Sequence, residues 1–155
     1  MLLFQVEDEP WAIAAAEVED IVSLASLQAL SSVATEQYQQ LAGVLNYHGE
    51  SLPVIDVSAV LGGQPAPQAL STRIAVVKDS GGEDGARYGL ILDRAYETAY
   101  LSETVCLPFH DRYVQAALKG PQGVVRRLAI APLLSHISQP AALPVDPHHR
   151  QFAIQ

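Results

Sequence analysis

Two short polar groupings in this sequence contain side chains that could do chemistry. The first is Cys106-x-x-x-His110-Asp111, which holds a thiol, an imidazole and a carboxylate, the groups of a nucleophile, a base and an orienting residue. A catalytic set is defined in space rather than by nearness along the chain, and no signature of a thiol enzyme accompanies these residues. We expect them to be structural, and a thiol enzyme that uses Cys106 is kept as an alternative.

The second grouping is the segment from Asn46 to Glu50, Asn-Tyr-His-Gly-Glu. Catalysis here would require His48 to work with a carboxylate such as Glu50, yet no nucleophile or set of metal ligands lies nearby in the sequence. The chain also has no phosphate-binding loop, dinucleotide fingerprint or zinc-protease motif. Adjacent imidazoles such as His148 and His149 rarely chelate an ion without other ligands. We therefore predict a binding module with no enzymatic activity, no cofactor and no metal.

Composition limits the partners of such a module. The chain has 155 residues, of which 49% are hydrophobic, which is enough for one domain with its own core. Its formal net charge of −8 repels nucleic acid and anionic lipid, so we expect neither partner and no direct membrane insertion. Cys106 is the single cysteine and the N-terminus lacks the features of a signal sequence, which favours the cytoplasm.

The elements that must position the Asn46 to Glu50 segment are strands. Alternating apolar residues predict a hairpin over 42–45 and 51–56, with Gly49 in the turn and Pro53 at an edge, a strand start or a bulge. Asp56 stands at the N-cap of a short helix over 57–61, which Gly62 and Gly63 end. Before this hairpin we expect another over 3–6 and 11–13, and a short helix within 14–22.

The second half of the chain repeats this order. Strands are expected over 72–78, 88–92, 113–118 and 124–130, with a short helix over 131–136. When the two halves of the chain are aligned, Trp11 matches Tyr88 and Gly49 matches Gly123 at nearly the same spacing, as a duplicated unit would require. The prediction is a mostly β fold of two small antiparallel barrels, each of about five strands.

The expected boundaries follow from this duplication. Residues 1–140 form one domain, with the first barrel at about 12–70 and the second at about 71–136, and terminal segments could be exchanged between the barrels. The proline-containing tail, residues 141–155, is expected to be flexible. Neither barrel is large enough to bury a sufficient core alone, so the seam between them should carry much of the stability.

The segment LAGVLNYHGESLPVIDVSAVLG resembles the central motif of the CheW-like chemotaxis coupling proteins, in which a turn of sequence Asn-x-Arg-Gly precedes Pro-(Val/Ile)-(Val/Ile)-Asp. The matching positions are Gly43, Asn46, Gly49, Pro53, Val54, Ile55 and Asp56. The resemblance spans about residues 2–136. It implies two intertwined SH3-like β-barrels without catalytic activity. It also implies an adaptor that joins the signalling tips of chemoreceptors to the regulatory domain of a CheA-type histidine kinase.

The resemblance also implies which residues meet these partners. The receptor-binding set would be Val18, Asp20, His48, Ala95 and Thr98, and the kinase-binding set would be Gly43 and Leu45. Four further residues, Asn46, Gly49, Pro53 and Asp56, would shape the turn and its flanks. Val18 and Ala95 could floor a groove that accepts a helix, or they could simply pack in the core, and both interpretations stay open.

His48 stands where the family pattern has an arginine. A fixed bidentate cation is thereby replaced by an imidazole with fewer donors. We expect Asp20 and His48 to approach each other as a weaker, pH-dependent pair. The sequence does not choose among swimming, pilus-driven motility and surface sensing. A CheW-like module that binds a different peptide or protein is the alternative function.

Overall fold

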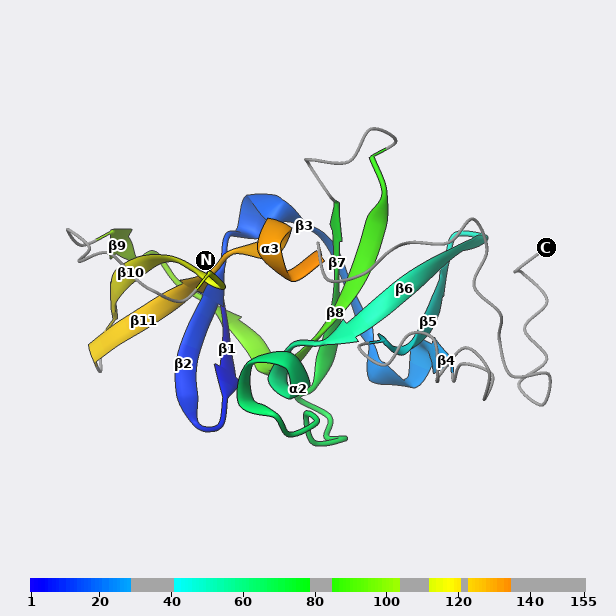
Figure 1. Ribbon diagram of the computed structural model, residues 1–155, viewed down its shortest axis with the longest axis horizontal. Helices are drawn as coiled ribbons and strands as arrows, with labels where there is room; N and C mark the ends of the chain where they lie inside the picture. Colours follow the sequence, from blue (N-terminus) through cyan, green and yellow to red (C-terminus); the bar gives the residue numbers. More distant parts are fainter. Residues whose placement is uncertain (29–40, 79–84, 104–111, 121–122, 135–155) are drawn as a thin grey trace.

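The computed structural model describes residues 1–28, 41–78, 85–103, 112–120 and 123–134, and these residues form a mostly β protein (Figure 1). The strands are β1 (Leu2–Val6), β2 (Glu9–Ile13), β3 (Val18–Ser23), β4 (Leu27–Gln28), β5 (Leu41–Tyr47), β6 (Glu50–Asp56), β7 (Arg73–Lys78), β8 (Arg87–Thr98), β9 (Ser102–Glu103), β10 (Val114–Gly120) and β11 (Gly123–Leu128). The helices are α2 (Val57–Gly62) and α3 (Ile130–Leu134), with 3-10 turns at η1 (Ala15–Glu17) and η2 (Leu24–Ser26).

The strands pair into one continuous sheet that folds into two barrels, which confirms the predicted fold class. The first barrel, at the right of Figure 1, runs β3-β7-β8-β6-β5-β4. The second barrel, at the left, runs β8-β1-β2-β11-β10-β9. Neither ring is closed by backbone pairing within the described residues. Instead, the chain itself passes from β3 through η2 into β4, and from the end of β8 into β9.

Each barrel is completed by a hairpin from the other half of the chain. The β1–β2 hairpin pairs with the end of β8 and, in parallel, with β11. The hairpin of β7 and the start of β8 pairs with β3 and, in parallel, with β6. The order β3-β4-β5-β6-α2 is therefore repeated as the end of β8-β9-β10-β11-α3, as the duplication predicts.

This exchange corrects the expected boundary between the barrels near residue 70. Strand β7 and the first half of β8 were expected in the second barrel, but they pair with β3 and β6 of the first. A reader of the sequence expects consecutive strands to share a barrel, because neighbouring elements usually pair. Here the hairpins cross instead, so the two halves are intertwined and each depends on the other for its closed shape.

The expected helix over 14–22 was wrong. Only η1 is helical, and the chain then extends into β3, which pairs antiparallel with β7. Alanine and glutamate favour a helix, but the β-branched residues Val18, Ile21 and Val22 fit a pleated strand and tertiary pairing overrides local propensity. Where the structure describes them, the other expected strands and helices lie within a few residues of the predicted limits, except that β8 was expected to end at residue 92 and continues to Thr98.

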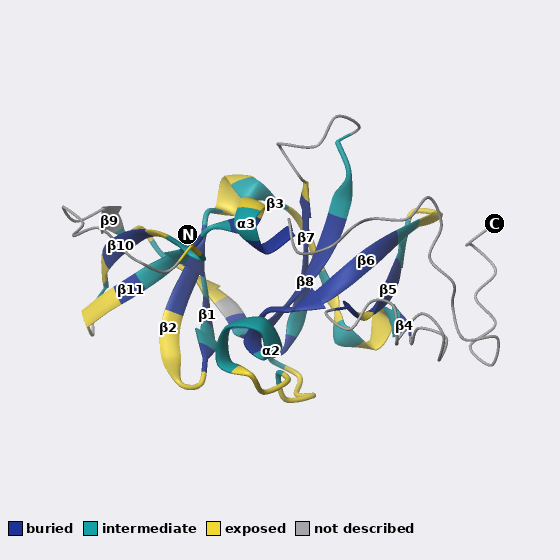
Figure 2. Cartoon of the chain, in the orientation of Figure 1, coloured by how far each residue is buried: buried dark blue, intermediate teal, exposed yellow. Residues whose placement is uncertain are grey.

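The largest core lies at the seam between the barrels. It combines Phe4 and Ile13 from the β1–β2 hairpin with Leu90 from β8 and Leu133 from α3, all at most 1% exposed. Figure 2 shows the same pattern, with buried colour running along the middle strands and exposed colour at the hairpin tips. The core inside the second barrel is smaller and includes Ala12 and Leu118. Burial of apolar surface therefore ties the two halves together at the point where they exchange hairpins.

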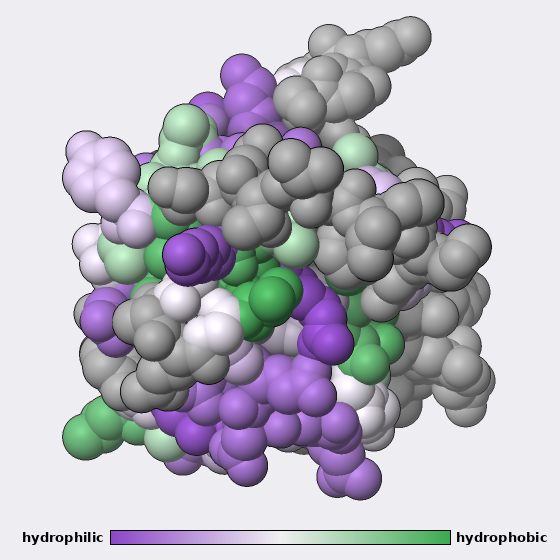
Figure 3. All heavy atoms as spheres, turned by 90° about the vertical axis from the view of Figure 1, so that its left-hand side faces the viewer, coloured by the Kyte–Doolittle hydropathy of each residue, from purple (hydrophilic) through white to green (hydrophobic). Residues whose placement is uncertain are grey.

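The end of the second barrel has a mixed surface (Figure 3). Hydrophilic residues gather on the lower part of this face, at the height of the β1–β2 turn in Figure 1. The turn is a two-residue loop in which Glu7 and Asp8 both have positive φ, 51° and 67°, as a type I′ hairpin requires. Acidic side chains at this tip therefore stay in solvent while the hairpin stem packs at the seam.

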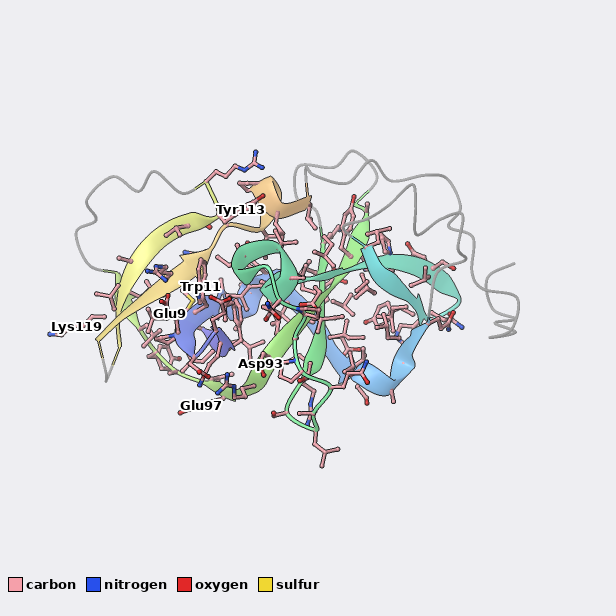
Figure 4. All side chains as sticks on the ribbon, turned by 60° about the horizontal axis from the view of Figure 1, so that its bottom comes forward. Glu9, Trp11, Asp93, Glu97, Tyr113 and Lys119 are labelled. Carbon is pink, nitrogen blue, oxygen red and sulfur yellow. The ribbon has the colours of Figure 1, made fainter. Side chains whose placement is uncertain are left out.

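Strand β8 serves both barrels, and it bends where it passes from one to the other. The pairing with β1 is irregular between Leu3 and Gln5, and Arg94 in this stretch has a φ of 51°. The Arg94 guanidinium donates to Oδ2 of Asp93, at 3.1 Å from Nη2, and to Oδ1 of Asp8, at 2.8 Å. The Asp93 side chain is only 6% exposed, and Figure 4 shows it where β8 crosses between the barrels. Arg94 therefore neutralises a buried carboxylate at the bend.

This arrangement predicts that Arg94→Ala destabilises the protein far more than Asp8→Asn. Removing the guanidinium leaves the buried Asp93 carboxylate unpaired, so we expect the free energy of unfolding to fall by about 2–4 kcal/mol. Asp8 is 84% exposed, and its loss should cost less than about 1 kcal/mol. Urea denaturation of the two variants measures the difference, and equal, small effects would show that Arg94 has no stabilising role at the bend.

Candidate functional site

The Asn46 to Glu50 segment forms the predicted turn between β5 and β6. Tyr47 pairs with Glu50, and the two loop residues His48 and Gly49 have φ values of 51° and 83°, again the pattern of a type I′ turn. Oδ1 of Asn46 accepts a hydrogen bond from the Gly49 amide at 3.2 Å. Gly49 tolerates this backbone conformation because it has no Cβ, whereas His48 must adopt it with a side chain. The turn consequently projects His48 into solvent.

Pro53 and Asp56 shape the strand that follows the turn and the helix after it. Pro53 lies opposite Val44 of β5, and the pairing of β6 with β8 begins only at the next residue, Val54. Pro53 has no amide hydrogen, and on the β8 side of the strand none is needed for pairing. Asp56 caps α2 by accepting a hydrogen bond from the Ala59 amide at 3.2 Å. Its other oxygen accepts from the Ala66 amide at 2.9 Å. Asp56 thus fixes both the helix and the segment that follows it.

Asp20 contacts a residue other than the one the sequence predicts. Its Oδ2 accepts a hydrogen bond from the Tyr47 hydroxyl at 3.2 Å, and its Oδ1 accepts from the Ile21 amide at 2.8 Å. The imidazole of His48 packs edge-on against the Tyr47 ring, with 4.3 Å between ring centroids. The expected pair of Asp20 with His48 is not formed in the described part of the chain, and Tyr47 contacts both residues instead.

A second residue at this surface was missed by the sequence reasoning. Arg87, at the start of β8, forms an ion pair with Glu19 of β3 at 2.6 Å and a longer one with Glu50 at 3.7 Å. Its side chain is 35% exposed. The hydrogen bond to Glu19, followed by that carboxylate's charge, raises the pKa of Arg87, so it stays protonated. Alternation alone could place Arg87 on a strand, but it could not place it beside Glu19, 68 residues away.

The other members of the predicted receptor-binding set lie elsewhere. Ala95 is 3% exposed within the seam core, and Val18 is half-buried against the same core. Their position favours core packing, so substitution of either residue would affect partner binding only by shifting the strand that carries it. Thr98 is exposed near the end of β8 and pairs with Leu2. The structure therefore brings together only Asp20 and the residues of the β5–β6 turn.

The two predicted kinase-binding residues are buried. Leu45 is 1% exposed and belongs to the core inside the first barrel. Gly43 lies against β4, where an added Cβ would come within 2.3 Å of the Gln28 carbonyl oxygen. Gly43 is therefore a close-approach position between two strands. The neighbouring residue Ala42 is exposed.

An apolar cavity of about 330 Å³ opens beside Ala42. Its walls include Leu24 of η2, Leu27 of β4 and Leu41 of β5, and Asp56 also lines it. A second cavity of about 480 Å³ shares Leu24 and Leu27 and continues along η2. The surface near Gly43 is thus apolar and concave, although Gly43 and Leu45 themselves lie beneath it.

The described residues contain no group of three or more histidine, cysteine, aspartate or glutamate side chains that could hold a metal ion. Cys106, His110 and Asp111 lie outside the described residues, as do the tail and its two histidines. Within the described ranges, no helix is long and apolar enough to cross a membrane. Among the described residues, Asp56 acts as a cap, Asn46 as a turn residue, and Arg87 and Arg94 as members of ion pairs.

Fold and surface together define a protein of two SH3-like β-barrels with exchanged hairpins. A family model described as the CheW-like domain matches residues 1–138, and the chain therefore belongs to this family. Among solved structures, it is similar to the scaffolding protein TtCheW from Thermoanaerobacter tengcongensis, with a TM-score of 0.68 and 19% identity over 86% of this chain and 85% of that one. At this identity the likeness shows the fold. A search of curated proteins gave no significant match.

The environment of Asp56 predicts how stability depends on pH. Burial raises the pKa of Asp56, backbone hydrogen bonds from Ala66 and Ala59 partly oppose the rise, and the charge of Asp93 adds to it. The folded protein therefore holds the Asp56 proton more tightly than the unfolded chain. This stabilising term is fully present below the ordinary aspartate pKa of about 3.9 and is lost as pH rises through the higher folded value.

We therefore expect the wild-type protein to have a larger free energy of unfolding than the Asp56→Asn variant. The difference between the two should be larger near pH 3.5 than near pH 7. The variant should lose about 1–2 kcal/mol, because the Asn Nδ2 cannot accept the hydrogen bond from the Ala66 amide. The loss should shrink as pH rises, because ionisation of the buried Asp56 carboxyl destabilises only the wild-type protein. Urea denaturation at several pH values measures the difference. A gap that widens as pH rises would contradict the account of Asp56.

Proposed function

We propose that the protein is a non-enzymatic adaptor that couples chemoreceptor signalling tips to a CheA-type histidine kinase in a chemosensory array. The observation that carries the proposal is the match to the CheW-like domain over residues 1–138, which includes both barrels and the turn between β5 and β6. The scaffolding role stated for TtCheW, whose fold this chain shares, supports the same function. An adaptor needs separate surfaces for its two partners.

The proposed receptor-facing surface is formed by exposed residues at the β5–β6 turn and on strand β3. Asp20 and His48 lie there, and Thr98 lies on the second half of β8. Val18 and Ala95 support these strands from the seam core and contribute by packing. The seam between the barrels positions both groups, since β8 runs through it.

The proposed kinase-facing surface is the apolar hollow on the first barrel near Gly43. Leu24, Leu27 and Ala42 line it, and the fully exposed side chain of Leu70 (92%) stands at the adjoining cavity. A partner with an SH3-like regulatory domain could bury apolar side chains against this hollow. Gly43 and Leu45 would act by keeping β4 and β5 in place.

The alternative is a CheW-like module that binds a different peptide or protein in a motility or surface-sensing pathway. The pathway itself is not selected by any described contact. The two proposals differ in one observable, because the alternative predicts no affinity for a receptor tip or for the kinase regulatory domain.

Binding of the two partners tests the proposed function. We expect the wild-type protein to bind a receptor-tip fragment and, separately, the kinase regulatory domain, with dissociation constants of about 10 μM in isothermal titration. Ala42→Arg should weaken kinase-domain binding about tenfold or more, because the long cation would fill the apolar hollow. It should leave receptor-tip binding unchanged.

Ala42→Arg serves better here than Gly43→Arg, whose side chain would collide with β4 and test folding instead. The matched control is Ala16→Arg, an exposed alanine on η1 that lines neither cavity and should leave kinase-domain binding unchanged. Failure of the wild-type protein to bind either partner at about 100 μM would favour the unrelated-module alternative.

A further inference from the structure

We propose that Arg87 supplies the fixed positive charge of the receptor-facing surface, and that Tyr47 is a positioning residue that orients Asp20 there. This inference rests on the proposed function and deepens it. Neither residue belongs to the set predicted from the sequence. The partner group that Arg87 would recognise is an oxygen acceptor, a carboxylate or a carbonyl.

The first argument comes from the position of Arg87 in the strand order. β8 lies between β7 and β6, and β3 lies beyond β7. From the start of β8 the guanidinium reaches Glu19 on β3 in one direction and Glu50 at the β5–β6 turn in the other. One side chain thus joins the two elements that carry Asp20 and His48.

The second argument concerns the donors that Arg87 has left. Nε donates to Oε2 of Glu19 at 2.6 Å, and Nη1 lies 3.7 Å from Oε2 of Glu50, which is an ion pair but too long for a hydrogen bond. Within the described residues, Nη2 donates no hydrogen bond. A guanidinium has five N–H donors in a planar fork, so this one can bind a partner's oxygen while it keeps both carboxylates in place.

The third argument is the state of the turn itself. His48 forms no ion pair in the part of the chain that the structure describes, and its ring packs against Tyr47. The turn therefore provides no fixed cation. Without Arg87 the surface would present Glu19, Asp20 and Glu50 uncompensated, and three carboxylates would repel an acidic partner group.

Tyr47 acts across a gap in the sheet. Strands β3 and β5 do not pair with each other directly, so backbone pairing connects Asp20 to the turn only by way of β7, β8 and β6. The Tyr47 hydroxyl spans this gap to Asp20. Partial burial, then the hydrogen bond to Asp20 and its charge, raise the pKa of Tyr47, so the phenol stays a neutral donor at neutral pH. Its ring meanwhile supports His48, and one side chain thus orders both exposed residues.

Titration of the full chain with a receptor-tip fragment tests the inference, using Arg87→Gln and Tyr47→Phe. We expect Arg87→Gln to raise the dissociation constant about fivefold to tenfold and to reduce its salt dependence, because a charged contact is lost. Tyr47→Phe keeps the ring and removes only the hydroxyl, and should raise the constant about threefold. Kinase-domain binding should change less than about twofold in both variants.

The matched control is Lys119→Gln, which removes one exposed cation from the far end of the second barrel (Figure 4) and should leave receptor binding unchanged. A rescue variant separates a charge effect from a packing effect. Adding His48→Arg to Arg87→Gln returns a cation to the same surface and should recover most of the lost affinity. A purely structural role for Arg87 would lower the thermal midpoint and would not be rescued.

The outcomes are distinct. Wild-type binding with unchanged affinity in Arg87→Gln overturns the inference and leaves the proposed function standing. If Arg87→Gln and Lys119→Gln lose the same amount of receptor-tip affinity, the inference is also overturned, because the effect then depends on net charge alone. Absence of wild-type binding to the receptor tip overturns the proposed function and this inference with it. Selective loss in Arg87→Gln with rescue by His48→Arg supports it.

Discussion

The exchange of hairpins between the two halves of the chain is the constraint on which the rest of this structure depends. Each half supplies four short strands and a helix, and each needs a hairpin from the other half to complete its barrel. The residues that meet at the crossing form the largest core. Because neither half of a duplicated chain this short could bury enough surface alone, the exchange makes one cooperative domain from two marginal ones.

Strand β8 connects that exchange to the proposed receptor-facing surface. Its first half holds Arg87 beside the β5–β6 turn, and its second half holds Thr98 on the other barrel. The bend between them is fixed by Arg94 and the buried Asp93. A partner that contacts both barrels therefore meets residues whose spacing is set by a single strand, and the surface is preorganised by the same contacts that hold the seam.

Local patterns predicted the parts of this structure that depend on neighbouring residues. The hairpins, the cap at Asp56 and the turn at Gly49 each follow from residues within a few positions of one another. The pairing of hairpins between halves, the burial of Leu45 and the contacts of Arg87 depend on residues far apart in the chain. The helix expected within 14–22 failed for the same reason, since pairing with β7 overrides local propensity.

The proposed role of Arg87 would offset a substitution in the motif from another part of the fold. His48 stands where the family pattern has an arginine, and the Arg87 guanidinium lies 3.7 Å from the Glu50 carboxylate at the same turn. The central claim is that this chain is an adaptor with two independent surfaces. The most direct test is analytical ultracentrifugation of the protein mixed with a receptor-tip fragment and the kinase regulatory domain. The account predicts a complex that contains all three; two mutually exclusive pairwise complexes would contradict it.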